Sequence, residues 1–326
     1  MFIYLMKRLI MLIPLLIGIS IISFMVIHLA PGSPADVQGQ LSQKVSLQAR
    51  QRLNQVYGLD KPLGVQYYHW FLRFLKFDFG NSFVDGQRVS NKIAKRIPIT
   101  LTINILSLFL IFLISIPIGV LSAVYAGSFF DRIMTVLVFV GFAMPVFWIA
   151  LLLMRFFGIT LHWLPISGIR SLEFENYSFF CKFIDYIKHL FLPVMLSAFT
   201  GLAGISRYMR TNMLEILRAD YIRTAKAKGL SLNRIYFVHA LKNALLPIIT
   251  ILGLLLPGLI GGSVIFESIF AIPGMGKLFF DSVMARDYPV IMGLLVIGAF
   301  LTLAGNLFAD MAYCVADPRI RYTDKK

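Results

Sequence analysis

Charged residues are scarce in this sequence of 326 residues, and acidic residues are the scarcest. Asp, Glu, Lys and Arg together make up 14% of the chain, against about 25% in an ordinary soluble domain. The hydrophobic set reaches 58%, which leaves too little polar surface for a soluble domain of this size. These shortages exclude soluble, disordered and fibrous proteins, and they indicate a protein that crosses a membrane several times.

Motifs for catalysis and metal binding are also missing. The five histidines are scattered, without an i,i+4 pair or an HExxH motif, and no GxSxG sequence occurs. Gly274-Met-Gly-Lys277 resembles the end of a phosphate-binding loop, but Ala271 stands where that loop needs its first glycine and Leu278 where it needs Ser or Thr. We therefore expect no enzyme activity, no ATPase motif, no metal site and no cofactor in this chain.

Six long uncharged runs are present, and a helix needs ~20 apolar residues to cross the hydrocarbon core. The runs are Leu9–Leu29, Ile97–Phe130, Ile133–Met154, His189–Ser206, Asn243–Phe266 and Tyr288–Ala309. They predict an all-α membrane protein with six transmembrane helices. The first run follows basic residues as a signal peptide does, but its 21 residues exceed the usual apolar core of about 7–15, so we expect an uncleaved span.

Basic residues are distributed unequally between the short connections. Fifteen Lys or Arg lie on the side of the N-terminus and six on the other side. The positive-inside rule therefore places both termini in the cytoplasm, and the net charge of +15 is explained by topology rather than by nucleic acid. Cys181 then falls outside and Cys314 at the inner end of the last span, which excludes a disulfide between them.

The order of the spans predicts the domain organisation. Residues 1–30 form the first transmembrane helix, 31–96 an extracytoplasmic segment, 97–313 a domain of five helices, and 314–326 a cytoplasmic tail. We expect amphipathic helices over Ser46–Tyr57 and Val65–Phe77 in the extracytoplasmic segment. The second is dense in aromatic residues, which is typical of a helix that rests at the lipid headgroups; a cap that meets a soluble partner is the alternative.

The connection between the fourth and fifth spans is the most informative stretch. Residues 207–242 hold eight Lys or Arg and two acidic residues, and we call residues 211–242 the basic loop. Helix-forming residues extend to Lys228, Gly229 ends the helix, and a new helix starts at Ser231. Ala225 and Gly229, four residues apart, would leave a small-residue face that another protein could approach closely. The charge suits an acidic partner or lipid headgroups, although positive-inside topology alone also explains it.

The spans are nearly free of ionisable residues, which argues against a carrier driven by protons or sodium. The sequence therefore favours a transport pathway through the membrane that another protein component drives.

Several motifs carry a resemblance to one family. They are Tyr57-Gly-Leu-Asp-Lys-Pro62, Asp220-Tyr-Ile-Arg-Thr-Ala-Lys-Ala-Lys-Gly-Leu230, Phe270-Ala-Ile-Pro-Gly-Met-Gly276, Arg286-Asp-Tyr-Pro289 and Asp317-Pro-Arg-Ile-Arg321. In this order they resemble the membrane permease subunits of dipeptide/oligopeptide ABC importers over essentially the whole chain. The general ABC pattern has Glu-Ala-Ala three residues before the glycine. Arg223-Thr-Ala225 stands there in this sequence, as in the peptide branch.

The resemblance implies a type-1 ABC importer permease fold in a bacterial cytoplasmic (inner) membrane. It also implies a complex with a second homologous permease, two ATP-binding subunits that hold ATP and Mg, and an extracytoplasmic solute-binding protein, all within membrane lipid. The basic loop is similar to the permease loop that docks on the ATPase. The residues that correspond to this ATPase-docking site are Asp220, Tyr221, Arg223, Thr224, Ala225, Ala227 and Gly229.

The substrate class stays open at this point. Relatives that carry peptides, nickel complexes, haem or antimicrobial peptides would share these motifs, because the binding protein does most of the selection. A passive channel and an intramembrane enzyme are the alternatives from other classes. The resemblance of the basic loop disfavours the first, and the missing catalytic motifs disfavour the second.

The predicted topology can be tested with reporter fusions. Fusions after Arg96 and Lys188 should report an extracytoplasmic position, and fusions after Asp131 and Lys228 a cytoplasmic one, because positive-inside topology orients the short connections. Paired alkaline phosphatase and fluorescent-protein activities measure the two sides. A cytoplasmic signal after Lys188 would contradict six spans.

Overall fold

The computed structural model describes residues 2–30, 34, 55–56 and 58–316, and the chain packs as two compact units. Among the described residues, unit 1 takes those within Met1–Thr100, Ile260–Ser268 and Pro273–Leu307. Unit 2 takes those within Leu101–Leu259, Ile269–Ile272 and Phe308–Lys326. In the described part of the chain, extended backbone pairs only in a single bridge between Asn81 and Arg88.

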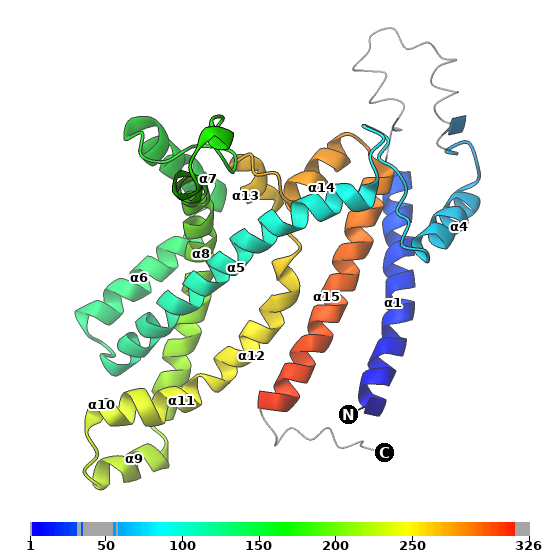
Figure 1. Cartoon of the computed structure of the whole chain (residues 1–326). Coiled ribbons are helices and arrows are strands. Elements are labelled where there is room, and N and C mark those ends of the chain that lie inside the picture. Colours follow the sequence, from blue (N-terminus) through cyan, green and yellow to red (C-terminus); the bar gives the residue numbers. More distant parts are fainter. Residues whose placement is uncertain (1, 31–33, 35–54, 57, 317–326) are drawn as a thin grey trace. The chain divides into compact units, whose positions relative to one another are not determined.

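Helices form nearly all of the ordered structure (Figure 1). In chain order they are α1 (Phe2–Leu29), α4 (Leu63–Phe74), α5 (Val89–Val124), α6 (Phe129–Ala143), α7 (Val146–Leu153), α8 (Phe179–Leu217), α9 (Asp220–Ala227), α10 (Leu232–Arg234), α11 (Leu241–Ala244), α12 (Leu246–Leu255), α13 (Val264–Ile269), α14 (Met275–Met284) and α15 (Tyr288–Ala316). Between them lie the π-helical turns η1 (Met154–Thr160) and η3 (Ile235–Ala240) and the 3-10 turns η2 (Phe174–Asn176) and η4 (Leu256–Leu259).

Five of the described helical stretches are long and apolar enough to cross a membrane. They are Ile10–Leu29, Val89–Val124, Phe179–Leu217, Leu232–Leu255 and Tyr288–Leu307. The number reaches six when the bent pair Phe129–Gly141 and Val146–Thr160 counts as one span. The all-α fold predicted from the sequence is confirmed, with five or six candidate spans in the described residues.

The bend lies in the run that the sequence predicts as the third span. The helix axis turns by 100° between Phe129–Gly141 and Val146–Thr160. Pro145 lacks an N–H and disfavours helical backbone in the residue before it, and Met144 is accordingly extended, with φ −89° and ψ 131°. Ile133–Met154 is therefore not one straight helix.

The run predicted as the fifth span, Asn243–Phe266, is divided as well. Helical structure begins earlier, at Leu232, and α12 ends at Leu255. A 3-10 turn and the positive φ of Gly262 (+68°) then separate α12 from α13. A Cβ on Gly262 would lie 2.6 Å from the backbone nitrogen of Gly276, so only glycine permits this close approach.

The aromatic stretch predicted as a helix over Val65–Phe77 forms α4, Leu63–Phe74, and one side of this helix packs into unit 1. Trp70 is buried against Phe24 of α1 and Met292 of α15. Tyr67 and Phe71, with Phe74, pack on the same cluster. The helix is thus held by two spans, rather than only resting on lipid. The other predicted helix, Ser46–Tyr57, lies outside the described residues apart from 55–56.

In unit 1, a buried carboxylate binds the segment that precedes the span Tyr288–Leu307. Glu267 of α13 is 4% exposed. Its Oε1 accepts a hydrogen bond from Thr100 Oγ1 of α5 at 2.9 Å, and its Oε2 accepts one from the Lys277 backbone N–H at 2.8 Å. The Thr100 hydroxyl in turn accepts from the Met275 N–H at 2.9 Å. Glu267 therefore binds the amino end of α14 and anchors it to α5.

Two opposing effects act on the ionisation of Glu267. Burial raises the pKa of the Glu267 carboxyl above its ordinary value, although the Lys277 N–H and the Thr100 hydroxyl stabilise the ionised form. The Lys277 ammonium does not compensate the charge, because it pairs with Asp281 at 2.9 Å.

The hydroxyl of Thr100 can be tested by two substitutions. Thr100→Val should lower the free energy of unfolding by about 1–3 kcal/mol, because the buried Met275 N–H loses its acceptor and Glu267 loses a donor. Thr100→Ser keeps the hydroxyl and should be less destabilising. Thermal unfolding of the full chain in detergent measures both. A Thr100→Val variant that is as stable as the wild type, with a loss only in Thr100→Ser, would mean that the methyl group matters and the hydroxyl does not.

Candidate functional site

The basic loop is a set of short helices in unit 2. Helix α8 ends at Leu217, and Ala219 is extended (φ −67°, ψ 148°), so the helix-forming stretch that precedes Lys228 is divided into α8 and α9. Gly229 ends the second helix with φ +77°. Ser231 stands immediately before α10. The predicted helix end at Gly229 and the new start at Ser231 are confirmed.

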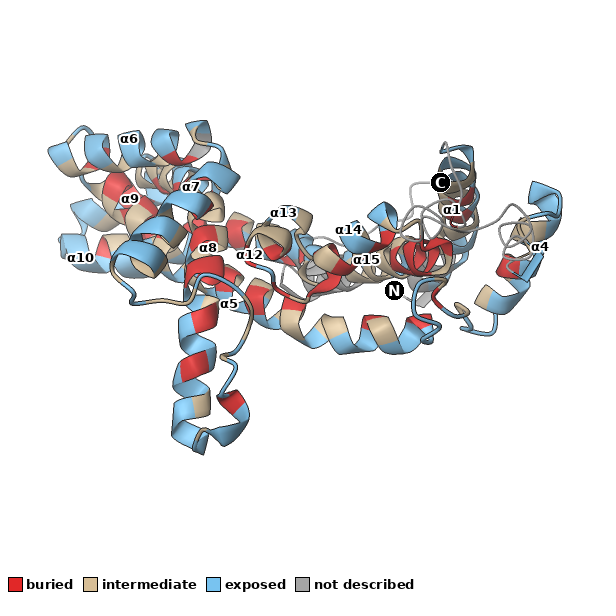
Figure 2. Ribbon diagram, turned by 90° about the horizontal axis from the view of Figure 1, so that it is seen from above, coloured by how far each residue is buried: buried red, intermediate tan, exposed pale blue. Residues whose placement is uncertain are grey.

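Helix α9 is fixed to the end of α8 by an apolar core. Ile222 of α9 is fully buried. It belongs to one cluster with Met209 and Met213 of α8 and with Ile235 and Ala240 of η3. Figure 2 shows buried positions recurring along α8. Because the cluster joins these helices, α9 and the adjoining end of α8 form one packed body.

The predicted docking residues do not all lie on one surface. Six of them are exposed: Asp220, Tyr221, Arg223, Thr224, Ala227 and Gly229. Ala225 is half-buried and packs against the core cluster. Of the small-residue face predicted for Ala225 and Gly229, Gly229 is exposed and Ala225 is half exposed, because Ala225 is three residues after Ile222 and turns part of its surface inward.

Gly229 itself has open space around it. A Cβ built on this residue meets no atom of the described structure within 4 Å, so the backbone conformation, with φ +77°, is what opposes a side chain there. Arg223 pairs with Asp220 at 3.4 Å, and both side chains are mostly exposed, so the pair contributes little to stability.

Two features of this surface were missed in the sequence. Three apolar side chains of α10 and η3, Leu232, Phe237 and Val238, are each about half exposed. The Asn243 amide donates to the Tyr221 hydroxyl at 2.9 Å and links α9 to α11. The exposed apolar side chains could have been expected from the sequence, because large apolar residues occur there within a basic stretch. The second depends on the fold.

An ion pair anchors this end of α8 to α6. The Arg210 guanidinium donates two hydrogen bonds of 2.7 Å to the Asp131 carboxylate, and the Gly127 N–H donates to the same carboxylate at 2.9 Å. Asp131 is 4% exposed. Arg207 also lies 5.5 Å from the ring centre of Phe139. The bidentate geometry fixes α8 in rotation as well as in distance.

The segment that resembles a phosphate-binding loop is already engaged within the protein. The Lys277 N–H donates to Glu267 and its ammonium pairs with Asp281. In the part of the chain that the structure describes, no group of His, Cys, Asp and Glu is arranged to hold a metal ion.

Loss of the Asp131 charge should destabilise unit 2. Asp131→Asn keeps an acceptor for Gly127 but removes the charge that faces Arg210, which leaves a partly buried cation unpaired. We expect a loss on the order of 1–3 kcal/mol in the free energy of unfolding, below the range for fully buried pairs because Arg210 is partly exposed. Thermal unfolding in detergent measures it.

Asp220→Asn is the matched control, because it makes the same substitution in the exposed pair with Arg223. It should leave the melting temperature unchanged. Equal effects of the two substitutions would contradict a special role of the Asp131–Arg210 pair.

Comparison with known proteins identifies the family. Residues 1–104 match the N-terminal domain of the binding-protein-dependent transport system membrane component, and residues 115–322 match the family of the binding-protein-dependent transport system inner membrane component. The chain is 46% identical over 320 residues to the oligopeptide transport system permease protein AppB of Bacillus subtilis, covering 98% of this chain and 99% of that protein.

Two further relatives are similar over their whole length. The dipeptide transport system permease protein DppB of Alkalihalophilus pseudofirmus is 37% identical, with 98% of this chain and 99% of that protein covered. The di/tripeptide transport system permease protein DppB of Pseudomonas aeruginosa is 36% identical, with coverage of 97% and 98%. With both parts of the family matched along one helical membrane protein, the chain belongs to the inner membrane permease components of binding-protein-dependent ABC importers.

Proposed function

We propose that this chain is a membrane-spanning subunit of an ATP-driven importer for dipeptides and oligopeptides. The names of its relatives support the substrate class. The complex would contain a second homologous permease, two ATP-binding subunits that hold ATP and Mg, and an extracytoplasmic solute-binding protein. Each permease would form half of the translocation pathway. Both termini and the basic loop would lie in the cytoplasm.

Helix α9 is the observation that carries the coupling role. It presents an exposed surface beside the half-exposed apolar residues Leu232 and Phe237, while Ile222 anchors it to the core under α8. A surface of this kind suits a protein partner, since interfaces combine an apolar centre with a polar rim. A displacement of α9 by the partner would be passed to α8 through tightly packed side chains, which transmit strain.

We assign the docking contact to the outward surface of α9 and the turn at Gly229. Ala225, which is half-buried, supports this surface partly from within. Arg223 lies at the rim. Hydrolysis of ATP takes place in the partner subunits in this proposal, and the permease contributes the moving helices.

Uptake by a strain that lacks the gene tests the function and the docking site together. The wild-type chain should restore uptake of radiolabelled trialanine. Gly229→Asn should reduce uptake at least tenfold and weaken co-purification of the ATP-binding subunits. Asn tolerates positive φ better than other residues with a side chain, so the substitution adds a side chain at the interface with the least backbone strain.

Two controls separate docking from folding. Gly168→Asn also replaces a glycine of positive φ with space around it, outside the basic loop, and should leave uptake unchanged. Arg223→Ala should have a small effect, because its pair with Asp220 is exposed. Normal uptake and normal co-purification with Gly229→Asn would refute the docking assignment, whereas a wild-type chain that restores no trialanine uptake would refute the peptide importer.

A further inference from the structure

Unit 1 contains a large open pocket that is lined by more basic than acidic residues. Its volume is about 1260 Å³. It is lined by the end of α1, the polar side of α4, the connection 76–90 and the start of α15. We call it the α1–α4–α15 pocket. It is separate from the basic loop, which belongs to unit 2.

The pocket lies at the ends of two membrane spans. His28 comes from the last turn of the span Ile10–Leu29, and Tyr288 is the first residue of the span Tyr288–Leu307. Both residues line the pocket, and their rings are 4.8 Å apart. Where spans end, the hydrocarbon gives way to lipid headgroups. The ends of these candidate spans suit a pocket at the level of the headgroups.

The charge of the lining is strongly positive. Four cations line the pocket, Lys61, Arg73, Lys76 and Arg88, and Asp78 is the only acidic residue among the lining residues. The Asp78 carboxylate accepts a hydrogen bond from the Gly80 N–H at 3.0 Å. Within the described residues none of the four cations forms an ion pair. Such a site attracts an anion.

The inner part of the pocket combines apolar surface with an unused donor. Phe24 and Met292 line it together with Trp70. Trp70 is 8% exposed, and its indole N–H is buried without a hydrogen-bond acceptor in the described structure. A buried donor without a partner is unfavourable and rare in folded proteins. The part of Trp70 that lines the pocket, together with Phe24 and Met292, offers apolar surface to a ligand with an apolar part.

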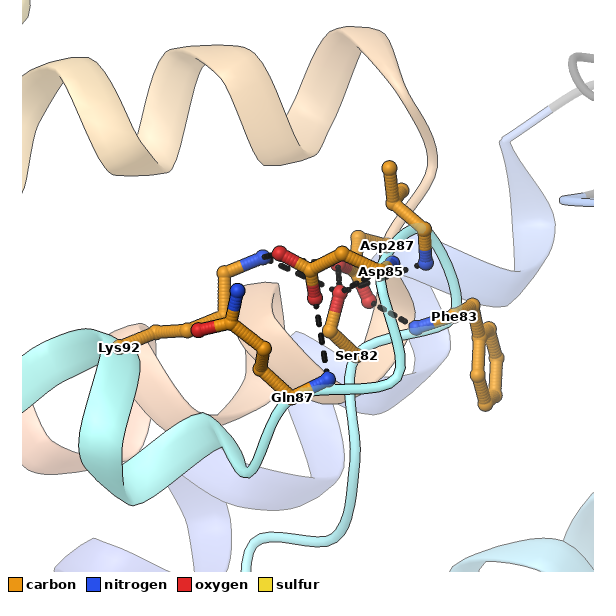
Figure 3. Close-up of polar contacts among 7 residues, drawn as sticks. Ser82, Phe83, Asp85, Gln87, Lys92 and Asp287 are labelled. Carbon is orange, nitrogen blue, oxygen red and sulfur yellow. Dashed lines mark hydrogen bonds and ion pairs between the residues drawn. The ribbon is translucent and has the colours of Figure 1, made fainter.

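The far wall is held in place by a buried polar network (Figure 3). Asp287, which is 1% exposed, accepts hydrogen bonds from the Ser82 hydroxyl and from the Phe83 N–H. Lys92 of α5 donates to the Ser82 hydroxyl at 3.1 Å and to Asp85 at 2.9 Å. These bonds attach the connection before α5 to the start of α15. A wall fixed in advance reduces the entropy that a ligand must lose on binding.

We propose that the α1–α4–α15 pocket binds the headgroup of an anionic phospholipid. The phosphate faces the cations of the pocket, among them Arg73 of α4 and Lys76, which follows α4. The glycerol part of the lipid lies towards Trp70. The acyl chains continue along the exposed apolar residues Ile21 and Met25 of α1, which lie seven and three residues before His28 and so beside the face that lines the pocket. With the orientation proposed above, the lipid belongs to the outer leaflet.

Native mass spectrometry of the delipidated full-length chain tests this proposal. Dioleoyl phosphatidylglycerol should bind at least tenfold more tightly than dioleoyl phosphatidylcholine, because two nearby cations together favour an anionic lipid by about this factor or more. Arg73→Gln with Lys76→Gln should abolish the preference. Trp70→Phe keeps an aromatic ring and should weaken binding several-fold.

The matched control is Arg170→Gln with Lys182→Gln, which removes the same charge from unit 2, where both cations lie over the Phe174 ring. It should bind phosphatidylglycerol as the wild type does. An equal loss in the control and in the pocket variant would show nonspecific surface attraction and overturn the proposal. All variants are compared at equal melting temperature in phosphatidylcholine, so that unfolding is not scored as lost binding.

Two further measurements identify the source of the phosphate. Glycerol 3-phosphate and inorganic phosphate should not compete at millimolar concentration, because they lack the apolar part; competition by either would indicate a site for small anions. If the pocket variant instead keeps its lipid preference and loses binding to the extracytoplasmic binding protein of the complex, the cations serve an acidic protein surface and the proposal is wrong.

Discussion

Hydrocarbon offers no hydrogen bonds to the backbone, and the rest of this structure depends on that constraint. Every apolar run must satisfy its own N–H and C=O groups, so the long runs become helices. The helices deviate only where local chemistry requires it. Pro145 cannot donate and forces Met144 into extended backbone. Gly262 permits a backbone approach that no other residue would allow.

Buried polar groups are placed where the spans end and connections begin. Thr100 and Glu267 bind the amino end of α14, and Asp287 binds the connection before α5. Each of these side chains accepts a hydrogen bond from a backbone N–H group for which neither the helix nor the lipid supplies an acceptor. The connections of unit 1 thereby become rigid, which gives the proposed lipid a preformed pocket.

In unit 2 the same physical chemistry serves the permease function. The core around Ile222 and Met213 joins α9 to the end of α8, and the Asp131–Arg210 pair joins α8 to α6. A helix that protrudes on a rigid base is a suitable contact for a partner that performs work elsewhere. Membership of the importer family agrees with the division of labour proposed above.

Much of the protein was determined by its sequence alone. The apolar runs identify a membrane protein with six candidate spans, and Gly229 and Ser231 mark helix boundaries in the basic loop, because length, helix-ending residues and capping residues act locally. The ordered motifs also identify the family. The sequence left open which side chains are buried, because burial depends on which helix faces pack against one another.

Only the tertiary structure decided the rest. Ala225 packs partly inward because Ile222 meets the core of α8, and Trp70 of α4 is buried because residues of α1 and α15 pack against it. Glu267 meets Thr100 across 167 residues of chain. Local periodicity describes one helix at a time, whereas the position of a side chain in a core or on a surface is set by contacts between segments far apart in the sequence.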